Sequence, residues 1–263
     1  MPKPNVLIAL RTYANTEALD FGRRFITALC EEDARLIPEL LSTSERFKDP
    51  FVDIDHFVRK WWAMPVKMYE DGRLVGERFA GPMWKRKSSL ASRGKVNHGL
   101  VTVSDRKLRS SIWYQCRWSS KVDFEHLFDA WVELSQPEVG MLHLFTEPEL
   151  RRKQSEAASS FENGSFGGRM KPGLPNIGWT MAYGRGYADE VDGARIKAAG
   201  FDVEERGGAS LVRVTKSLSD VVDDFAYFSG RRAVLKGLFR PGLFWIQDEP
   251  HQTGGEQSNR SKA

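Results

Sequence analysis

Residues 110–118, SSIWYQCRW, decide the fold because apolar and polar side chains alternate along them. Ile112, Tyr114 and Cys116 share one face of an extended strand, and Arg117 lies on the other face. This period of two is typical of a strand that places one face on a core and the other toward solvent. Such half-buried strands belong to antiparallel sheets. The stretch therefore predicts a meander of antiparallel strands.

Helices and further strands follow in both directions from this stretch. Asp123 can cap a helix that ends before Pro137, and residues 139–145 predict a buried strand. Upstream, residues 6–10 predict a first buried strand, and Thr16 can cap a helix after it. The apolar residues that define one face of this earlier helix are Ala18, Phe21, Phe25 and Leu29.

Glycine-bearing turns predict two hairpins. Asp71-Gly72 accepts the positive φ angles of a tight turn between residues 66–69 and 74–79. Gly207-Gly208 can join residues 201–205 to residues 210–215 in the same way. The remaining expected elements are strands at 98–104 and 176–183, a helix at 189–199, helices starting at Ser217 and Ser229, and an edge strand at 243–246.

This order of elements predicts an α+β fold, mainly an antiparallel twisted sheet with helices packed on it. We expect a single domain over residues 1–250, with two lobes of similar composition separated by a long polar, glycine-rich loop at 147–175. Residues 251–263 carry no apolar side chain before the terminal alanine, so we expect a disordered tail.

The composition limits the class of protein. The net charge of +4 comes from 39 basic and 35 acidic residues, and much of the excess lies between Lys85 and Lys95 and in the tail. The apolar run at 6–10 is too short to span a membrane and has no signal-peptide cleavage pattern, so we expect a cytoplasmic protein without membrane contact. Cys30 and Cys116 are expected to be structural thiols rather than a disulfide or a nucleophile.

Motifs that carry catalysis are missing from the sequence. No phosphate-binding glycine loop or nucleophile elbow occurs, and paired carboxylates at expected helix starts are typical of helix capping. We therefore expect no enzyme, no cofactor, no metal and no small-molecule substrate, although an active site assembled from distant residues stays an alternative. The histidines, which lack the spacing of metal ligands, are His56, His98, His126, His143 and His251.

One basic stretch suggests a different function. A tryptophan followed by clustered cations can stack a base and attract a nucleic-acid backbone. The structural alternative is a solvated loop between strands. The residues of this candidate nucleic-acid patch are Trp84, Lys85, Arg86, Lys87, Arg93 and Lys95.

Residues 176–183, NIGWTMAY, carry a Gly-Trp-x-x-x-Tyr pattern that resembles a strand of the immunity protein 52 family. The expected strand and helix over 6–29 and the glycine-led stretch 207–215, GGASLVRVT, are similarly placed in that family, whereas residues 60–95 and 147–175 match nothing in it. The resemblance implies a bacterial protein encoded beside a polymorphic or type VI secreted toxin. Such a protein binds the toxin and blocks its active site or substrate entry, without catalysis.

The resemblance also implies where a toxin binds. Some toxins of this kind resemble nucleases, and an inhibitor of a nuclease is expected to present acidic groups to the basic cleft. This chain is net basic, so a local acidic face close to the matched strand is the candidate. The alternative function is that of a basic nucleic-acid-binding accessory protein, with nucleic acid the less expected partner, and the alternative role of the two aromatic residues is core packing. The candidate partner-binding residues are Trp179, Tyr183, Asp189, Glu190, Asp192, Glu204 and Glu205.

Overall fold

The computed structural model describes residues 4–99, 108–150, 155–166 and 173–250. In this part of the chain, helices and strands alternate irregularly around one large antiparallel sheet. The predicted α+β class is confirmed. The division into two lobes stays a prediction.

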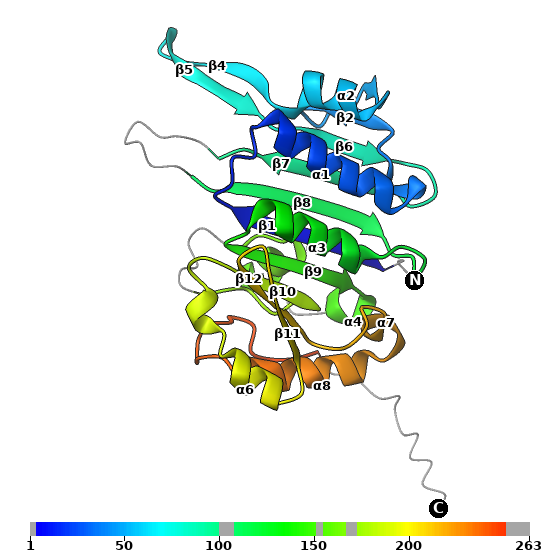
Figure 1. Ribbon diagram of the computed structural model, residues 1–263, viewed down its shortest axis with the longest axis vertical. Coiled ribbons are helices and arrows are strands. Elements are labelled where there is room, and N and C mark those ends of the chain that lie inside the picture. Colours follow the sequence, from blue (N-terminus) through cyan, green and yellow to red (C-terminus); the bar gives the residue numbers. More distant parts are fainter. Residues whose placement is uncertain (1–3, 100–107, 151–154, 167–172, 251–263) are drawn as a thin grey trace, which may run out of the picture.

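Ten strands form the main sheet, each antiparallel to its neighbours, and two more form a separate hairpin that projects from the body (Figure 1). Their bounds are β1 Asn5–Thr12, β2 Leu40–Ser42, β3 Asp49–Pro50, β4 Met64–Glu70, β5 Arg73–Ala80, β6 Met83–Arg86, β7 Ser92–Asn97, β8 Ser110–Arg117, β9 Val139–Phe145, β10 Thr180–Tyr183, β11 Asp202–Arg206 and β12 Ala209–Arg213. The order across the sheet is β11-β12-β10-β9-β1-β8-β7-β6-β2-β3, and β4 pairs with β5.

The helices differ in length and position. Helices α1 and α3 lie next to each other across one face of the sheet, and α6 and α8 lie at the end where β11 and β12 form the edge (Figure 1). The bounds are α1 Leu19–Glu32, α2 Ile54–Phe57, α3 Phe124–Ser135, α4 Glu147–Leu150, α5 Glu156–Glu162, α6 Gly193–Ala198, α7 Asp220–Asp223 and α8 Phe225–Lys236, with shorter turns η1 Ala34–Leu36, η2 Val58–Trp62 and η3 Ala188–Glu190. None of the helices in the described ranges is both long and apolar enough to cross a membrane.

Strand β1 occupies the centre of the sheet. Val6 lies opposite Cys116 of β8 on one side and Leu144 of β9 on the other. Residues 6–10 are all buried, because helices cover one face of this strand and later chain segments cover the other. This explains why its sequence is a continuous apolar run rather than an alternating one.

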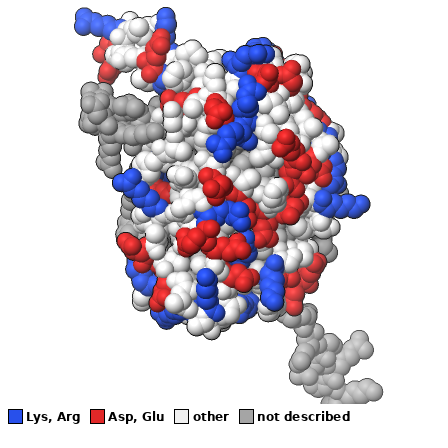
Figure 2. Space-filling view, viewed as in Figure 1, with Lys and Arg blue, Asp and Glu red and all other residues white. Residues whose placement is uncertain are grey.

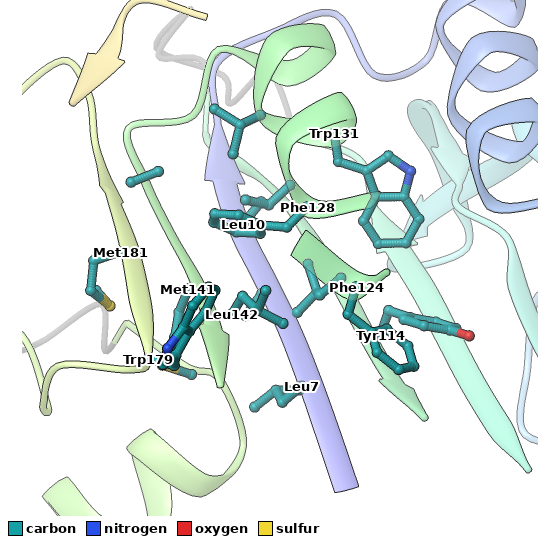
Figure 3. Close-up of a cluster of buried hydrophobic side chains, with 14 of the residues drawn as sticks. Leu7, Leu10, Tyr114, Phe124, Phe128, Trp131, Met141, Leu142, Trp179 and Met181 are labelled. Carbon is teal, nitrogen blue, oxygen red and sulfur yellow. The ribbon is translucent and has the colours of Figure 1, made fainter. Parts of the chain in front are cut away.

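Aromatic side chains fill the space between α1, α3 and the sheet. The rings of Phe25 and Trp131 stack with centroids 4.2 Å apart, and Trp131 meets Tyr114 of β8 edge-on at 5.7 Å. The indole Nε1 of Trp131 donates a hydrogen bond to the carbonyl oxygen of Phe25 at 3.1 Å, so its polar atom is satisfied. Figure 3 shows Tyr114, Phe128 and Trp131 gathered beneath α3. Burying each such side chain contributes roughly 1.5–3 kcal/mol.

The opposite face of the sheet is covered only in part. Strands β9 and β10 are buried at every position, because residues from α5 and α8 pack against them: Phe161 and Phe228 lie with ring centroids 5.1 and 5.7 Å from His143. Strands β7 and β8 instead bury only alternate residues. Among the described residues, no helix lies on the face of β7 and β8 that carries Arg93 and Trp113.

A cluster of buried charges fastens the end of the described chain to α8. Arg232 donates to both carboxylate oxygens of Glu149, at 3.0 and 3.1 Å, and its Nε donates to Glu249 at 2.7 Å. Lys236 pairs with the other oxygen of Glu249. We call these four residues the ionic clasp. Residues 243–246, expected as an edge strand, form only a bridge to Leu174 within the described chain.

The predicted caps Thr16 and Ser229 are wrong, and α7 begins at Asp220 rather than at Ser217. The predicted cap Asp123 is confirmed by its hydrogen bond from the backbone nitrogen of His126 at 2.9 Å. Helix α1 has no side-chain cap, and Thr16 instead donates to Ser110 at 2.8 Å from a buried position. Ser229 lies inside α8, which Asp224 caps. In both wrong cases the hydroxyl has a tertiary partner, which local sequence does not reveal.

Two predicted loops differ in part from the structure. The segment 147–175 contains α4 and α5, with Ser155 capping α5, so its described parts are not one long loop. The basic segment from Lys85 to Lys95 is a loop only over 87–91, because it begins at the end of β6 and finishes in β7. Most of the expected strand at 98–104 and the tail at 251–263 lie outside the described residues.

Candidate functional site

A hollow of about 700 Å³ lies on the uncovered face of the sheet. It spans β6, β7 and β8 and is bordered by the loop between β2 and β3. We call it the basic hollow. Its lining residues are Asn5, Glu45, Phe47, Met83, Lys85, Arg86, Lys87, Ala91, Ser92, Arg93, Gly94, Lys95, Trp113, Gln115 and Arg117.

Strand register brings the residues of the basic hollow together. Lys85 of β6 lies opposite Arg93 of β7, which lies opposite Gln115 of β8. In the next row on the same face, Lys95 lies opposite Trp113. Because side chains alternate along a strand, these two rows point away from α1 and α3.

The cations of the basic hollow lie over aromatic rings. The ammonium group of Lys85 is 4.2 Å from the ring centroid of Phe47, and that of Lys95 is 5.8 Å from the ring of Trp113. Within the described residues, Lys85, Lys95 and Arg93 form no ion pair. These three cations therefore present positive charge to the hollow without an ion-pair partner in the described part of the chain.

The predicted nucleic-acid patch is only partly assembled here. Lys85, Arg86, Lys87, Arg93 and Lys95 all line the hollow, and Arg86 also donates to the carbonyl oxygen of Ile37 at 2.9 Å. Trp84 is fully buried among the aromatic residues under α1, so its ring is not available to stack on a base. A Cβ at Gly94, its neighbour on β7, would lie 2.2 Å from this ring.

The residues of the matched motif are core residues. Trp179 is fully buried, and its indole Nε1 donates to Thr215 Oγ1 at 2.9 Å. Tyr183 is fully buried as well, and burial raises the pKa of its phenol. Neither ring reaches the surface, so neither can contact a partner directly in this conformation.

The predicted acidic residues lie at three separate elements. Asp189 and Glu190 belong to η3, and Asp192 caps α6 by accepting from the backbone nitrogen of Arg195 at 3.0 Å. Glu190 pairs with Arg240 at 2.7 Å. Glu190 and Asp192 therefore already have partners within the chain.

The other two acidic candidates lie on the edge strand β11. Glu205 accepts from Ser210 Oγ at 2.6 Å. Glu204 pairs with Arg213 at 3.0 Å. Both are exposed, and both already have a local partner.

Glu204 belongs to a larger charge network between α3 and the β11–β12 hairpin. Arg213 also contacts Glu125 and lies 3.5 Å from Asp129, which pairs with Arg206 at 3.3 Å. Burial raises the pKa of both the Glu125 and Asp129 carboxyls, against the pull of the arginines. Figure 2 shows acidic and basic side chains intermixed on this face, so it does not form one acidic surface.

Sequence reasoning missed the aromatic and apolar part of the basic hollow. The alternation along 110–118 places Trp113, Gln115 and Arg117 on the face away from the core, which is the available signal. Phe47 has no such signal, because it reaches the hollow from a loop. Among the described residues, no group of three or more His, Cys, Asp or Glu side chains is arranged to hold a metal ion.

Comparison with known proteins identifies a structural relative but no sequence family. No protein-family model and no curated protein matches the chain. A solved structure of a T6SS protein from Pseudomonas aeruginosa has a similar fold, with a TM-score of 0.57 over 92% of this chain and 77% of that chain. The two sequences are 8% identical, so the likeness shows the fold alone. The resemblance to the immunity protein 52 family stays a prediction.

Proposed function

We propose that the chain is an immunity-type protein associated with type VI secretion, which binds a cognate bacterial toxin in the cytoplasm and blocks its active site or substrate entry. The observation that carries the proposal is the fold shared with a T6SS protein over 92% of the chain. The Gly-Trp-x-x-x-Tyr stretch at 178–183 supports the same class of protein from the sequence. Such a role needs a shaped surface and no catalysis.

The geometry is compatible with inhibition by binding. The core is rich in aromatic side chains. The uncovered sheet face consists mainly of paired strands, which are more rigid than loops. Rigid surfaces lose little entropy on association, which favours tight complexes. Aromatic and arginine side chains, which line the basic hollow, are the residues most enriched at strong interfaces.

The test is co-expression with the protein encoded by the neighbouring gene. We expect that protein to arrest bacterial growth when produced alone, and this chain to restore growth and to co-purify with it. If the neighbour is harmless, or if growth is not restored, the proposed function is wrong.

A second candidate function, a nucleic-acid-binding accessory protein, draws on the positive charge of the basic hollow. Phosphate contacts would make such binding strongly salt-dependent, with losses of about 10³–10⁵ in affinity between about 50 and 200 mM salt for many contacts. A gel-shift assay at these two salt concentrations tests it.

A further inference from the structure

The basic hollow begins where the cover on the sheet ends. A Cβ placed at Gly164, just after α5, would lie 2.7 Å from Ala9 of β1 and 3.5 Å from Trp113 of β8. The chain after α5 therefore packs directly against β1 and reaches the border of β8. Beyond Trp113, the sheet face carries lysine and arginine stems instead of a packed helix.

The positive charge of the hollow indicates that its partner carries negative charge. Six of its fifteen lining residues are Lys or Arg, whereas Glu45 is its single acidic lining residue. Arg86 has an acidic neighbour outside the lining, Glu39 at 3.8 Å. Arg93 and Lys95, on the strand between β6 and β8, have none among the described residues. An acidic group is thus the complement that the surface lacks.

The rings of the hollow indicate a protein rather than a nucleic acid. Base stacking requires free aromatic faces. Here a lysine lies over Phe47 and another over Trp113, and Trp84 is buried on the other side of the sheet. Met83 adds an apolar, adaptable contact of the kind found at protein interfaces. This combination suits carboxylate side chains set among apolar ones.

We infer that the basic hollow is the surface by which the chain holds its toxin, and that the toxin presents an acidic segment to it, with Asp or Glu side chains next to apolar ones. This inference rests on the proposed function. It places the interface on the uncovered face of β6, β7 and β8, away from the acidic residues 189–205. The toxin surface that is recognised is accordingly an acidic one and not a basic substrate cleft.

The experiment reverses charge inside and outside the hollow. Arg93→Glu and Lys95→Glu, singly and together, change strand residues of the hollow without touching the core. Arg78→Glu is the matched control, because it reverses an exposed arginine on a strand of the β4–β5 hairpin, which lies outside the hollow lining. Thermal unfolding of each variant establishes that the fold is retained. The probe is the purified protein of the neighbouring gene, with affinity followed by calorimetry and growth rescue followed in cells.

We expect each single reversal in the hollow to weaken binding at least about tenfold, the double reversal to abolish growth rescue, and Arg78→Glu to behave as the wild type. If the hollow variants bind and rescue like the wild type, the inference is overturned while the proposed function stands. If the wild type itself neither binds nor rescues, the proposed function is overturned and the inference with it.

A parallel measurement addresses the nucleic-acid alternative. A fluorescent single-stranded oligonucleotide is titrated into the wild type and the double variant at about 50 and 200 mM salt. We expect weak binding that higher salt removes. Tight oligonucleotide binding that is lost in the double variant, together with unchanged toxin affinity, would assign the hollow to nucleic acid and overturn the inference.

Discussion

Arg232 contacts both carboxylate oxygens of Glu149, at 3.0 and 3.1 Å, and both side chains are completely buried. Two charges removed from water are tolerated only because they neutralise each other and share further hydrogen bonds with the protein. Arg232 also reaches the carbonyl oxygen of Ile177 at 3.3 Å, so the pair joins α4 and α8 to the segment before β10.

Replacing Arg232 by Ala removes the arginine that neutralises the buried Glu149 carboxylate. We expect the free energy of unfolding to fall by about 3–5 kcal/mol, measured by urea denaturation. Arg24→Ala on the exposed side of α1 is the control and should change stability by less than about 0.5 kcal/mol. Equal effects of the two variants would contradict a stabilising role for the ionic clasp.

His98 predicts a pH dependence of stability. It is buried, its Nε2 lies 2.8 Å from the carbonyl oxygen of Trp62, and burial lowers its pKa. A lowered folded pKa means that the unfolded state binds more protons. The stabilisation is therefore complete above about pH 6.5, the pKa of an unfolded histidine, and is lost as the pH falls through the folded pKa. Compared with His98→Gln, the wild type should lose more stability between about pH 8 and pH 5.

His126 is expected to change stability with pH in the opposite direction to His98. Its Nδ1 lies 2.7 Å from Glu32, and this hydrogen bond raises its pKa. Its contribution is present below the unfolded pKa and is lost as the pH rises through the folded one. His126→Gln should thus reduce wild-type stability more at low pH than at high pH, by a small amount because the ring is exposed. If the difference in stability between the wild type and each histidine variant did not change with pH, these assignments would be contradicted.

Two helical glycines should respond to alanine in opposite directions. A Cβ at Gly22 of α1 would lie 2.3 Å from the ring of Trp62, whereas a Cβ at Gly230 of α8 would meet nothing within 4 Å. Gly230→Ala should stabilise the protein by about 0.4–1 kcal/mol through the unfolded state. Gly22→Ala should destabilise it by about 1–3 kcal/mol, because overpacking outweighs helix propensity. Thermal unfolding distinguishes the two, and a stabilising Gly22→Ala would show that Trp62 moves freely.

The two thiols should be nearly inert in the folded protein. Burial raises the pKa of Cys116 to about 11 and that of Cys30 to about 12. Since the thiolate is the reactive species, an aromatic disulfide reagent at about pH 8 should label neither residue quickly, and both should react once urea unfolds the chain. Rapid labelling of the native protein would indicate local opening around α1 or β8.

Local patterns in the sequence predicted individual helices and strands better than they predicted which elements pack together. The alternation along 110–118, the Asp123 cap and the Asp71-Gly72 turn are short-range signals, and β8, α3 and the β4–β5 hairpin follow from them. The φ angles of Asp71 and Gly72, +49° and +76°, are those the turn requires. The fold class follows from these elements together.

Tertiary contacts decided what the sequence did not predict. Thr16 fails as a cap because its hydroxyl bonds to Ser110 across the core, and Ser229 lies within reach of Glu249 on the last described segment. The basic hollow depends on the register between β6, β7 and β8, and on Phe47, which lies in the loop between β2 and β3. Opposite sheet faces bury Trp84 and leave Trp113 partly accessible, and the alternation along 110–118 signals this only for Trp113.

The central position of β1 has a consequence for biosynthesis. Its apolar residues pair with β8 and β9, which are translated more than about a hundred residues later, at about 5–20 residues per second. For several seconds, therefore, the apolar residues of β1 are outside the ribosome before β8 and β9 are available to pair with them. We expect chaperones to bind this segment during that time. The central sheet can be completed only after β9 has emerged, so translation delay sets a lower limit on how soon a newly made molecule can act.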